Sequence, residues 1–289
     1  MDIRTLNYFK TVAELEHISN AARKLKIAQP ALTRSIHHLE EELGYPLFER
    51  EKNRIYLNDN GKLFFDAASQ ILMILDNAKL KLQEQNQNRE LQITIAIRSA
   101  SSILSQPISS FMRSHPEISF RFVNEAEGAM PDHADFLLYS SASFSKNRQE
   151  YLLWTEPLFV AVNPKHPIAG LKSVALSQLK TEDFILLDDR NDLYWIAMEY
   201  FRRAGFSPRI AATSEKPNII QNLLFENAGI TILPGSMQSS REFSDLRFLP
   251  ISDMACFRYI YLIPKPNRHL TAVMKEFQAS IFEFYRKEG

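Results

Sequence analysis

The residues best suited to bind a partner form one stripe at helical spacing near the start of the chain. Its polar and basic members are Pro30, Thr33, Arg34 and His37. Apolar residues recur on the opposite side at steps of four, three and four, namely Leu32, Ile36, Leu39 and Leu43. A helix with this pattern buries one face and offers the other. Guanidinium, imidazole and hydroxyl groups donate hydrogen bonds, so the chemistry offered is recognition of phosphates and base edges.

The placement of charge around this stripe favours a polyanionic partner. No acidic residue lies between Glu16 and Glu40, whereas four positive charges do: Arg23, Lys24, Lys26 and Arg34. Residues 1–58 as a whole contain nine Lys or Arg and eight Asp or Glu, which leaves a net charge of only +1. The position of the charges, rather than their sum, therefore indicates binding to a polyanion.

Two helices joined by a tight turn would position the stripe. Ser19 or Asn20 can cap a short helix, and we expect the second helix to begin at Pro30, because proline suits the first helical position. Small side chains at Ala21 and Ala22 let two helices cross closely. This is the pattern of a helix-turn-helix, whose second helix enters the DNA major groove. An ordinary helical hairpin with a solvated face would produce the same pattern, and the two helices alone do not distinguish these alternatives.

The flanking segments add an earlier helix and a hairpin. The sequence MDIRTLNYF opens a helix, and residues 48–50 and 54–57 form short extended runs joined by charged residues. These runs predict a two-stranded wing with three basic residues, Arg50, Lys52 and Arg54. Arginine on a wing can enter a narrow minor groove, where the electrostatic potential is most negative.

The first 60 or so residues closely resemble the winged helix-turn-helix of the LysR-type transcriptional regulators. The resemblance rests on the segments FKTVAE, AARKL, QPALTRSIHHLEEELG, PLFER and LNDNG. It implies a regulator that binds double-stranded DNA as a dimer, or as a tetramer, and that contacts RNA polymerase. The DNA contacts it implies come from Gln29, Pro30, Thr33, Arg34, His37 and Arg54. Ala28 stands where the family commonly has serine, so we expect a cap or phosphate contact to be lost there.

A long helix follows this domain, which we place at residues 1–58. Between residues 59 and 90, apolar residues alternate between steps of four and three: Phe64, Ala68, Ile71, Leu75, Ala78 and Leu82. This is a heptad seam, and it predicts a linker helix, capped by Asn58, that pairs with the same helix of a second copy. A helix packed on its own domain is the alternative. A two-fold dimer would read a roughly palindromic site with half-sites about one helical turn, or a multiple of it, apart.

Residues 91–289 alternate short apolar strands with helices, which predicts parallel sheets covered on both faces. This part looks like the two-lobed effector domain of the same family, which is similar in fold to periplasmic binding proteins. By that resemblance, the segments LFVAVNP and RYIYLIP cross between lobes. The first lobe would combine about 91–160 with 264–289, and the second would span about 161–263.

Open α/β sheets bind ligands beyond the carboxyl ends of their strands. The first such point follows the strand LQITIAI and carries Arg98, Ser99, Ser101 and Ser102. We expect these residues to hold a small-molecule effector with a carboxylate or another anionic group, and residues 188–195 and 213–218 to face the same cleft. The alternative is that the serines only cap a helix. Segment 124–134, which contains Pro131, is too short for a helix that the family usually has, so the class of ligand does not carry over.

Other classes of protein are disfavoured. The chain lacks G-x-S-x-G, P-loop, G-x-G-x-x-G and H-E-x-x-H motifs, so we expect no enzyme, no cofactor and no metal site. The single cysteine, Cys256, is expected to be a buried apolar residue. No stretch is long and apolar enough to span a membrane, and the protein is expected in the cytoplasm. The sequence thus predicts a ligand-responsive, sequence-specific DNA-binding regulator; the alternative is a DNA-bound regulator that has lost its response to small molecules.

Overall fold

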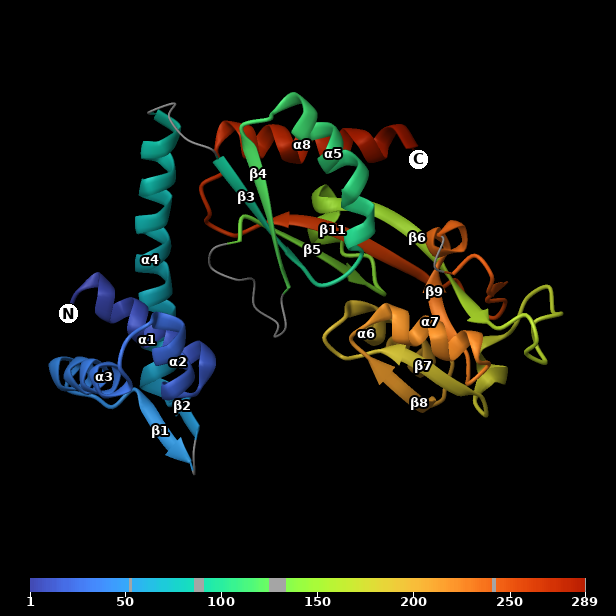
Figure 1. The fold of residues 1–289 in the computed structure, drawn as a ribbon, viewed down its shortest axis with the longest axis horizontal. Coiled ribbons are helices and arrows are strands. Elements are labelled where there is room, and N and C mark those ends of the chain that lie inside the picture. Colours follow the sequence, from blue (N-terminus) through green and yellow to red (C-terminus); the bar gives the residue numbers. More distant parts are fainter. Residues whose placement is uncertain (52–53, 86–90, 125–133, 241–242, 289) are drawn as a thin grey trace. The chain divides into compact units, whose positions relative to one another are not determined.

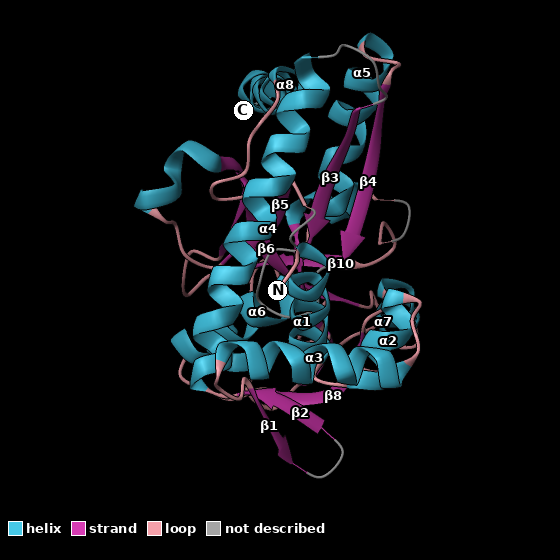
Figure 2. Ribbon diagram, turned by 90° about the vertical axis from the view of Figure 1, so that its left-hand side faces the viewer, coloured by secondary structure: helices cyan, strands magenta, loops and turns pink. Residues whose placement is uncertain are grey.

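The computed structural model describes residues 1–51, 54–85, 91–124, 134–240 and 243–288, and it divides into two compact units, residues 1–88 and 89–289 (Figure 1). The first unit contains, in chain order, α1 (Ile3–Leu15), α2 (Ile18–Leu25), α3 (Gln29–Leu43), β1 (Phe48–Glu51), β2 (Arg54–Leu57) and α4 (Asp59–Gln85). Helices α1 to α3 pack together, α1 also packs against α4, and the β1–β2 hairpin projects from them (Figure 2). This is the predicted winged helix-turn-helix followed by a long helix.

The apolar stripes of these helices meet in one core. Its fully or nearly fully buried members include Leu6, Phe9, Val12, Ala21, Ala22, Leu32, Ile36 and Leu39. The two alanines are buried in this core between α1 and α3, as the close helix crossing requires. At about 1.5–3 kcal/mol for each large side chain that is buried, this core supplies most of the free energy that holds the three helices together.

The segment that joins the wing to α4 explains the LNDNG sequence. The Asn58 side chain accepts a hydrogen bond from Gly61 N at 2.8 Å and donates one to Pro46 O at 2.9 Å. The predicted cap at Asn58 is therefore confirmed. Gly61 is required because a Cβ atom there would lie 2.0 Å from Leu47 O. The carboxylate of Glu40 completes this joint by accepting from Leu47 N at 2.7 Å, which ties α3 to the base of the wing.

Two details of the helix starts differ from the prediction. Helix α2 begins at Ile18 after His17, and no side chain caps it, because Ser19 instead donates from Oγ to Gln29 Oε1 at 2.9 Å. Helix α3 begins at Gln29, one residue earlier than predicted. Pro30 still lies in the first turn, where its missing N–H leaves no backbone acceptor unsatisfied.

Helix α4 carries an apolar seam that is covered near the start of the helix and exposed farther along. Phe64 and Ala68 pack on the core of the first unit together with Phe65 and Leu72. A second set of apolar residues remains exposed: Leu63, Ile71, Ile74 and Leu82. Phe64 and Ala68 of the predicted seam thus pack within their own domain, whereas Ile71 and Leu82 of the same seam are exposed.

The second unit contains one large mixed sheet and one small parallel pair. The large sheet has the order β10 (Arg247–Pro250), β6 (Leu152–Val162), β11 (Phe257–Pro264), β5 (Phe136–Ser141), β3 (Leu91–Ile97) and β4 (Ile118–Asn124), and β9 (Thr231–Pro234) also pairs with β6. The small pair is β7 (Asp183–Leu187) with β8 (Arg209–Ser214). Among the described strands, β3 pairs parallel with β4 and β5, and β7 pairs parallel with β8. The expectation of parallel sheets is met by these pairs and corrected for β6, β9, β10 and β11, which pair antiparallel.

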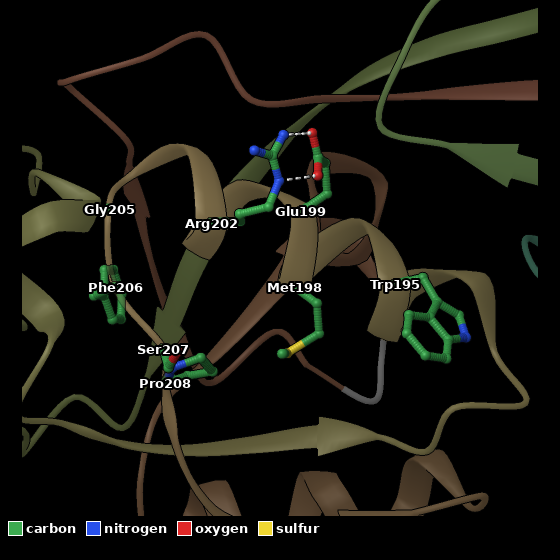
Figure 3. Close-up of a pocket in the computed structure, with 8 residues that line it drawn as sticks. All are labelled: Trp195, Met198, Glu199, Arg202, Gly205, Phe206, Ser207 and Pro208. Atoms are coloured by element: carbon green, nitrogen blue, oxygen red, sulfur yellow. Dashed lines mark hydrogen bonds and ion pairs between the residues drawn. The ribbon is translucent and has the colours of Figure 1, made fainter.

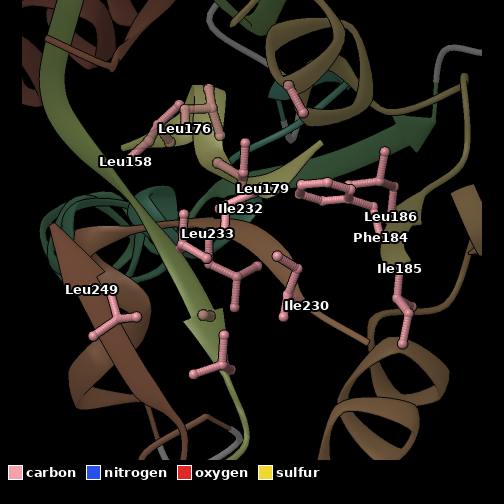
Figure 4. Close-up of a cluster of buried hydrophobic side chains, with 14 of the residues drawn as sticks. Leu158, Leu176, Leu179, Phe184, Ile185, Leu186, Ile230, Ile232, Leu233 and Leu249 are labelled. Carbon is pink, nitrogen blue, oxygen red and sulfur yellow. The ribbon is translucent and has the colours of Figure 1, made fainter. Parts of the chain in front are cut away.

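The helices of this unit cover two separate cores. The first core lies under α5 (Ser105–Ser114) and α8 (Ala272–Glu288), and the second lies among α6 (Asp192–Arg203), α7 (Pro217–Phe225) and the strands near them (Figure 4). Short 3₁₀ helices complete the fold: η1 (Ser101–Leu104), η2 (Lys146–Tyr151), η3 (Leu176–Leu179) and η4 (Gly235–Ser239). The unit is thus the expected two-lobed α/β domain.

Strand pairing moves the predicted boundaries between the lobes. β11 pairs with β5 from Tyr259 to Pro264, and its Ile260 and Leu262 lie in the first core, so residues 257–263 belong to the first lobe and not to the second. Leu158 and Val160, which lie within the predicted crossing segment LFVAVNP, belong to the second core. The sequence shows a strand at each place but not its register, which decides the lobe. The predicted loss of a helix at 124–134 falls mostly on residues 125–133, outside the described residues.

Two smaller expectations can be compared with the described residues. Cys256 is buried, as predicted, and burial raises the pKa of its thiol to about 12. None of the helices described here is both long enough and apolar enough to cross a lipid bilayer.

Candidate functional site

Helix α3 presents most of the residues predicted to bind DNA. Gln29, Pro30, Arg34 and His37 are exposed, and Thr33 is half-buried. Leu32, Ile36 and Leu39 on the other side are buried in the core, and Leu43 is half-buried. The two stripes of the sequence thus become one buried face and one solvent-exposed face of the same helix.

The polar groups on this face differ in how far they are already engaged. Thr33 donates from Oγ1 to Gln29 O at 3.0 Å, and His37 Nδ1 lies 3.2 Å from Glu41 Oε1. Within the described part of the chain, no hydrogen bond or ion pair holds the Arg34 guanidinium. An exposed guanidinium without an acidic neighbour keeps its donors for a carboxylate, a phosphate or a guanine edge.

The start of α3 lacks the side-chain cap that a serine would provide. Ala28 is the residue before the helix, and its carbonyl accepts from Ala31 N at 3.0 Å and from Leu32 N at 3.2 Å. No side chain caps the first turn. The positive end of the helix dipole therefore faces an environment without a local negative charge, which favours an anion there.

The wing is held against the helices by its backbone. Ile55 N donates to Glu16 O at 3.1 Å, and β1 pairs with β2 from Phe48 opposite Leu57 to Glu51 opposite Arg54. Arg54 is exposed at the end of this hairpin. The side chain of Arg50 and the whole of Lys52 lie outside the described residues.

The second predicted site follows β3, where the structure brings Arg98 and Ser99 together with a carboxylate. Asp192, from the first turn of α6, accepts from Ser140 N at 2.7 Å and from Ser99 Oγ at 3.1 Å. Its other oxygen lies 3.0 Å from Arg98 Nε. Ser99 Oγ also lies 2.6 Å from Ser140 Oγ. The donors predicted to hold an anionic ligand therefore already hold an anion of the chain itself.

The buried environment of Asp192 disfavours the charged form of its carboxyl. Asp192, Ser99 and Ser140 are all buried. Burial raises the pKa of the Asp192 carboxyl above its ordinary value, although the bonds from Ser140, Arg98 and Ser99 act in the opposite direction. The desolvation of the carboxylate is therefore only partly offset by its partners.

The remaining predicted effector residues are placed differently. Ser102 is exposed, and the side chain of Ser101 lies outside the described residues. Ala100 precedes η1 with a φ of 60°, and no side chain caps this 3₁₀ helix. Ser99, the buried serine of the group, bonds to Ser140 and Asp192, so its hydroxyl is not a helix cap.

A second buried charge pair lies beside this site and was not identified from the sequence. Arg258 of β11 and Glu156 of β6 are register partners, and Arg258 Nε donates to Glu156 Oε1 at 2.5 Å. Both are buried, and burial lowers the pKa of Arg258. The charge of Asp192 acts on Arg258 as well. No sequence signal links these residues, because one charged residue in each of two apolar strands gives no motif.

The two segments expected to face the same cleft meet each other at the ends of β7 and β8. Arg190 pairs with Asp188 and lies with its Nη2 2.9 Å from Glu215 Oε2. Within segment 188–195, Asp192 is the residue that reaches Arg98 and Ser99. The sequence therefore identified the segment, but not the residue or its role.

An open groove of about 610 Å³ is lined by residues of α6 and of the segment that follows it (Figure 3). Its lining is Trp195, Met198, Glu199, Arg202, Gly205, Phe206, Ser207 and Pro208. Glu199 accepts two hydrogen bonds from Arg202 and one from Arg203, each at 2.8 Å. These bonds lower the pKa of Glu199 to about 2. None of the predicted effector residues lines this groove.

Comparison with known families matches both units. Residues 3–62 match the model described as bacterial regulatory helix-turn-helix protein, lysR family, and residues 84–285 match the LysR substrate binding domain. The transcriptional dual regulator GltC of Bacillus subtilis (strain 168) is 30% identical over 296 residues, which cover 99% of this chain and 98% of GltC. The HTH-type transcriptional regulator BenM of Acinetobacter baylyi is 28% identical over 306 residues, which cover 100% of this chain and 98% of BenM.

Solved structures agree with the fold. The crystal structure of full-length CbnR complexed with its target DNA matches with a TM-score of 0.60 and 23% identity and covers 100% of both chains. At this identity, the match shows that the two proteins share the order of a helix-turn-helix, a long helix and a two-lobed domain.

Proposed function

The chain belongs to the LysR family of DNA-binding transcriptional regulators, which are not enzymes, and on that premise we propose how its residues carry out regulation. We propose that it binds roughly palindromic DNA sites as a homodimer or homotetramer and that it contacts RNA polymerase. We further propose that an anionic small molecule changes its activity by binding between the two lobes, at the residues that follow β3, which we call the interlobe site. The observation that carries the DNA part is the exposed face of α3, with an unpaired Arg34 opposite a buried Leu32.

In this proposal α3 lies in the major groove. Arg34 and Gln29 read base edges, while Thr33, His37 and the start of the helix at Pro30 contact bases or phosphates. Arg54 on the wing enters the adjacent minor groove. The buried leucines carry no contact to DNA, but they fix the rotation of α3 and so decide which side chains face the duplex.

The exposed apolar stripe of α4 supports the oligomer. Ile71, Ile74 and Leu82 are 45%, 66% and 58% exposed within one chain, on a helix whose N-terminal half already packs on the first unit. A second copy of α4 would cover them and bury apolar surface at about 25 cal/mol per Å². Two copies related by a two-fold axis would present two α3 helices to half-sites of opposite orientation.

Arg98, Ser99, Ser101 and Ser102 are the residues that we propose for the effector. A ligand that changes the relation of the lobes would shift the populations of two states of the regulator, provided that it binds one state more tightly. A second candidate function is a DNA-bound regulator without a small-molecule response, and the internal Asp192 carboxylate favours it, because the donors are already occupied. Titration of Asp192 variants with acetate distinguishes a regulator that responds to a small anion from one that does not.

DNA selected from random sequences by the full-length protein tests the proposed interface. Arg34→Ala should weaken binding to the selected site by about 1–3 kcal/mol and leave the thermal stability unchanged, because a bidentate base contact is lost from an exposed side chain. Affinity measured by fluorescence anisotropy should also fall steeply with added salt, with a smaller slope for the variant.

Arg113→Ala is the matched control, since Arg113 is an exposed arginine on α5 that bonds only to Ser109 among the described residues. Its affinity for DNA should equal that of the wild type. If Arg34→Ala binds as well as Arg113→Ala does, the assignment of α3 as the reading helix is wrong.

A further inference from the structure

We propose that Asp192 is a built-in ligand of the interlobe site, and that the effector of this protein carries a carboxylate-like anionic group that takes its place. The inference rests on the proposed effector function and names both the chemical class of the ligand and the residue with which the ligand competes.

The donors around Asp192 have the composition of a carboxylate receptor. One oxygen accepts from a backbone N–H, that of Ser140, at 2.7 Å and from the Ser99 hydroxyl at 3.1 Å. The other faces the Arg98 guanidinium at 3.0 Å. All three donors belong to the first lobe, at the ends of β3 and β5, and the carboxylate belongs to the second lobe. A free carboxylate would find the same three partners.

The carboxylate is not needed to build the helix that carries it. Asn191 caps α6, and its Oδ1 accepts from Leu193 N at 2.9 Å. The side chain of Asp192 instead points away from its own helix toward Ser99, which is 93 residues earlier in the chain. The hydrogen bonds and the ion pair of this carboxylate are therefore made with the first lobe, while Asn191 caps the helix.

The exchange is energetically reasonable because the buried carboxylate is imperfectly compensated. Desolvation is the largest influence on Asp192, and it raises the pKa of the carboxyl despite three donors. A charge that is released to water recovers its hydration, so a ligand that brings its own carboxylate needs to supply only part of the binding free energy.

This arrangement selects against neutral ligands. With Asp192 in place, Arg98 is already neutralised, and a neutral group offers nothing that compensates for the buried donors if Asp192 leaves. An anionic ligand would accept the same bonds from Ser140, Ser99 and Arg98. Asp192 would then no longer link the second lobe to the first. The effector would therefore separate the carboxylate of α6 from the ends of β3 and β5, a change that a lobed regulator can transmit.

Small anions used as probes test the inference in the full-length protein. The variants are Asp192→Ala, which leaves a space of carboxylate size, and Asp192→Asn, which keeps the shape but not the charge. Thermal unfolding is followed with increasing sodium acetate at constant ionic strength, and acetamide serves as the neutral probe of similar shape.

Asp192→Ala should melt below the wild type, and acetate should restore its melting temperature saturably, whereas acetamide should not. The apparent affinity for acetate should follow the order Ala, Asn, wild type, with at least about a tenfold difference between the first and the last, because the internal carboxylate competes only in the wild type. Adding Arg98→Ala to Asp192→Ala should abolish the response. Should the alanine variant fail to fold, the comparison of Asp192→Asn with the wild type still decides the order.

Equal affinities for acetate in all three proteins, or equal effects of acetate and acetamide on Asp192→Ala, would overturn the inference. DNA binding of the same variants, with and without acetate, keeps the two proposals apart. An acetate site whose occupation leaves DNA binding unchanged would retain the internal ligand but remove the effector role. If the three proteins bind DNA normally but their acetate affinities do not follow the expected order, the DNA-binding function stands and the role of Asp192 as an internal ligand is wrong.

Discussion

Helix α3 and the residues around Arg98 contain similar residue types in opposite states. Each combines an arginine with hydroxyl groups near the start of a helix, and the sequence predicted anion recognition at both. Arg34 is exposed, and no acidic residue of the described chain pairs with it, whereas the side chain of Arg98 is 29% exposed and pairs with a buried carboxylate at 3.0 Å. The comparison teaches that residue type indicates what a site can bind, while the fold decides whether the site is free.

The physical difference lies in solvation. A guanidinium in water keeps its hydration and costs nothing until a partner arrives, so Arg34 can remain unpaired. Donors that are closed off from water must find an acceptor inside the protein, because an unsatisfied buried donor costs about 1–3 kcal/mol. Ser99 and Ser140 are buried, and the fold supplies Asp192 to them.

The largest expected effect is a loss of stability, and it tests whether the buried face of α3 holds the exposed face in place. Leu32 is completely buried, so Leu32→Ala should lower the free energy of unfolding of the first unit by about 2–5 kcal/mol. DNA binding should be lost along with the fold. Chemical denaturation of the full-length protein, followed by circular dichroism, measures the change.

Tyr45→Ala is the control for this variant, because Tyr45 is 64% exposed in the same unit. We expect its stability to stay within about 0.5 kcal/mol of the wild type. Equal losses for Leu32→Ala and Tyr45→Ala would contradict the division of α3 into a buried and a free face.

An intermediate effect should distinguish the two arginines. Arg98→Ala removes a charged partner of buried Asp192 and should cost the second unit about 1–3 kcal/mol, whereas Arg34→Ala should leave stability unchanged. Thermal and chemical unfolding of the two variants in parallel make the comparison. If Arg98→Ala is as stable as the wild type, the pair with Asp192 contributes nothing, and the contrast drawn between the two regions fails.

The smallest expected effect concerns an acid that is paired at the surface. The bonds from Arg202 and Arg203 lower the pKa of Glu199 from 4.5 to about 2, so its contribution to stability is present above pH 4.5 and is lost as the pH falls toward 2. The stability difference between the wild type and Glu199→Gln should therefore be small and constant near neutrality and should shrink on acidification below pH 4.5. Denaturation between about pH 5 and 3 measures it.

Glu226→Gln provides the comparison for Glu199, since Glu226 is exposed and no ion pair of the described residues includes it. Its difference from the wild type should not follow the same profile. A Glu199 profile that grows on acidification would contradict the assigned direction of the pKa.

Local patterns predicted the first unit well because its elements are close in sequence. The steps of three and four place Leu32, Ile36 and Leu39 in the core, and Asn58 caps α4 as expected. The start of α2 was predicted wrongly, because Ser19 bonds to Gln29 across the turn rather than to its own helix. That choice depends on how two helices cross, which a local pattern does not contain.

The sequence predicted some of the residues around Arg98, but not that they already bind a carboxylate of the same chain. Arg98 and Ser99 follow a recognisable strand, whereas Ser140 and Asp192 carry no motif and lie 52 residues apart. The lobe boundary at 263 failed for a related reason, since the pairing of β11 with β5 depends on register between distant segments.

The sequence by itself determined the helical faces, the wing, the long linker and the family, because these follow from periodicity and from motifs within a few turns of chain. The tertiary structure alone decided that Asp192 meets Arg98 and Ser99, that Arg258 meets Glu156, and that α4 packs on the first unit at Phe64 and Ala68 but leaves Leu82 exposed. These contacts join residues far apart in the chain, and whether a polar group there is free or already satisfied depends on what folding brings within about 3 Å of it.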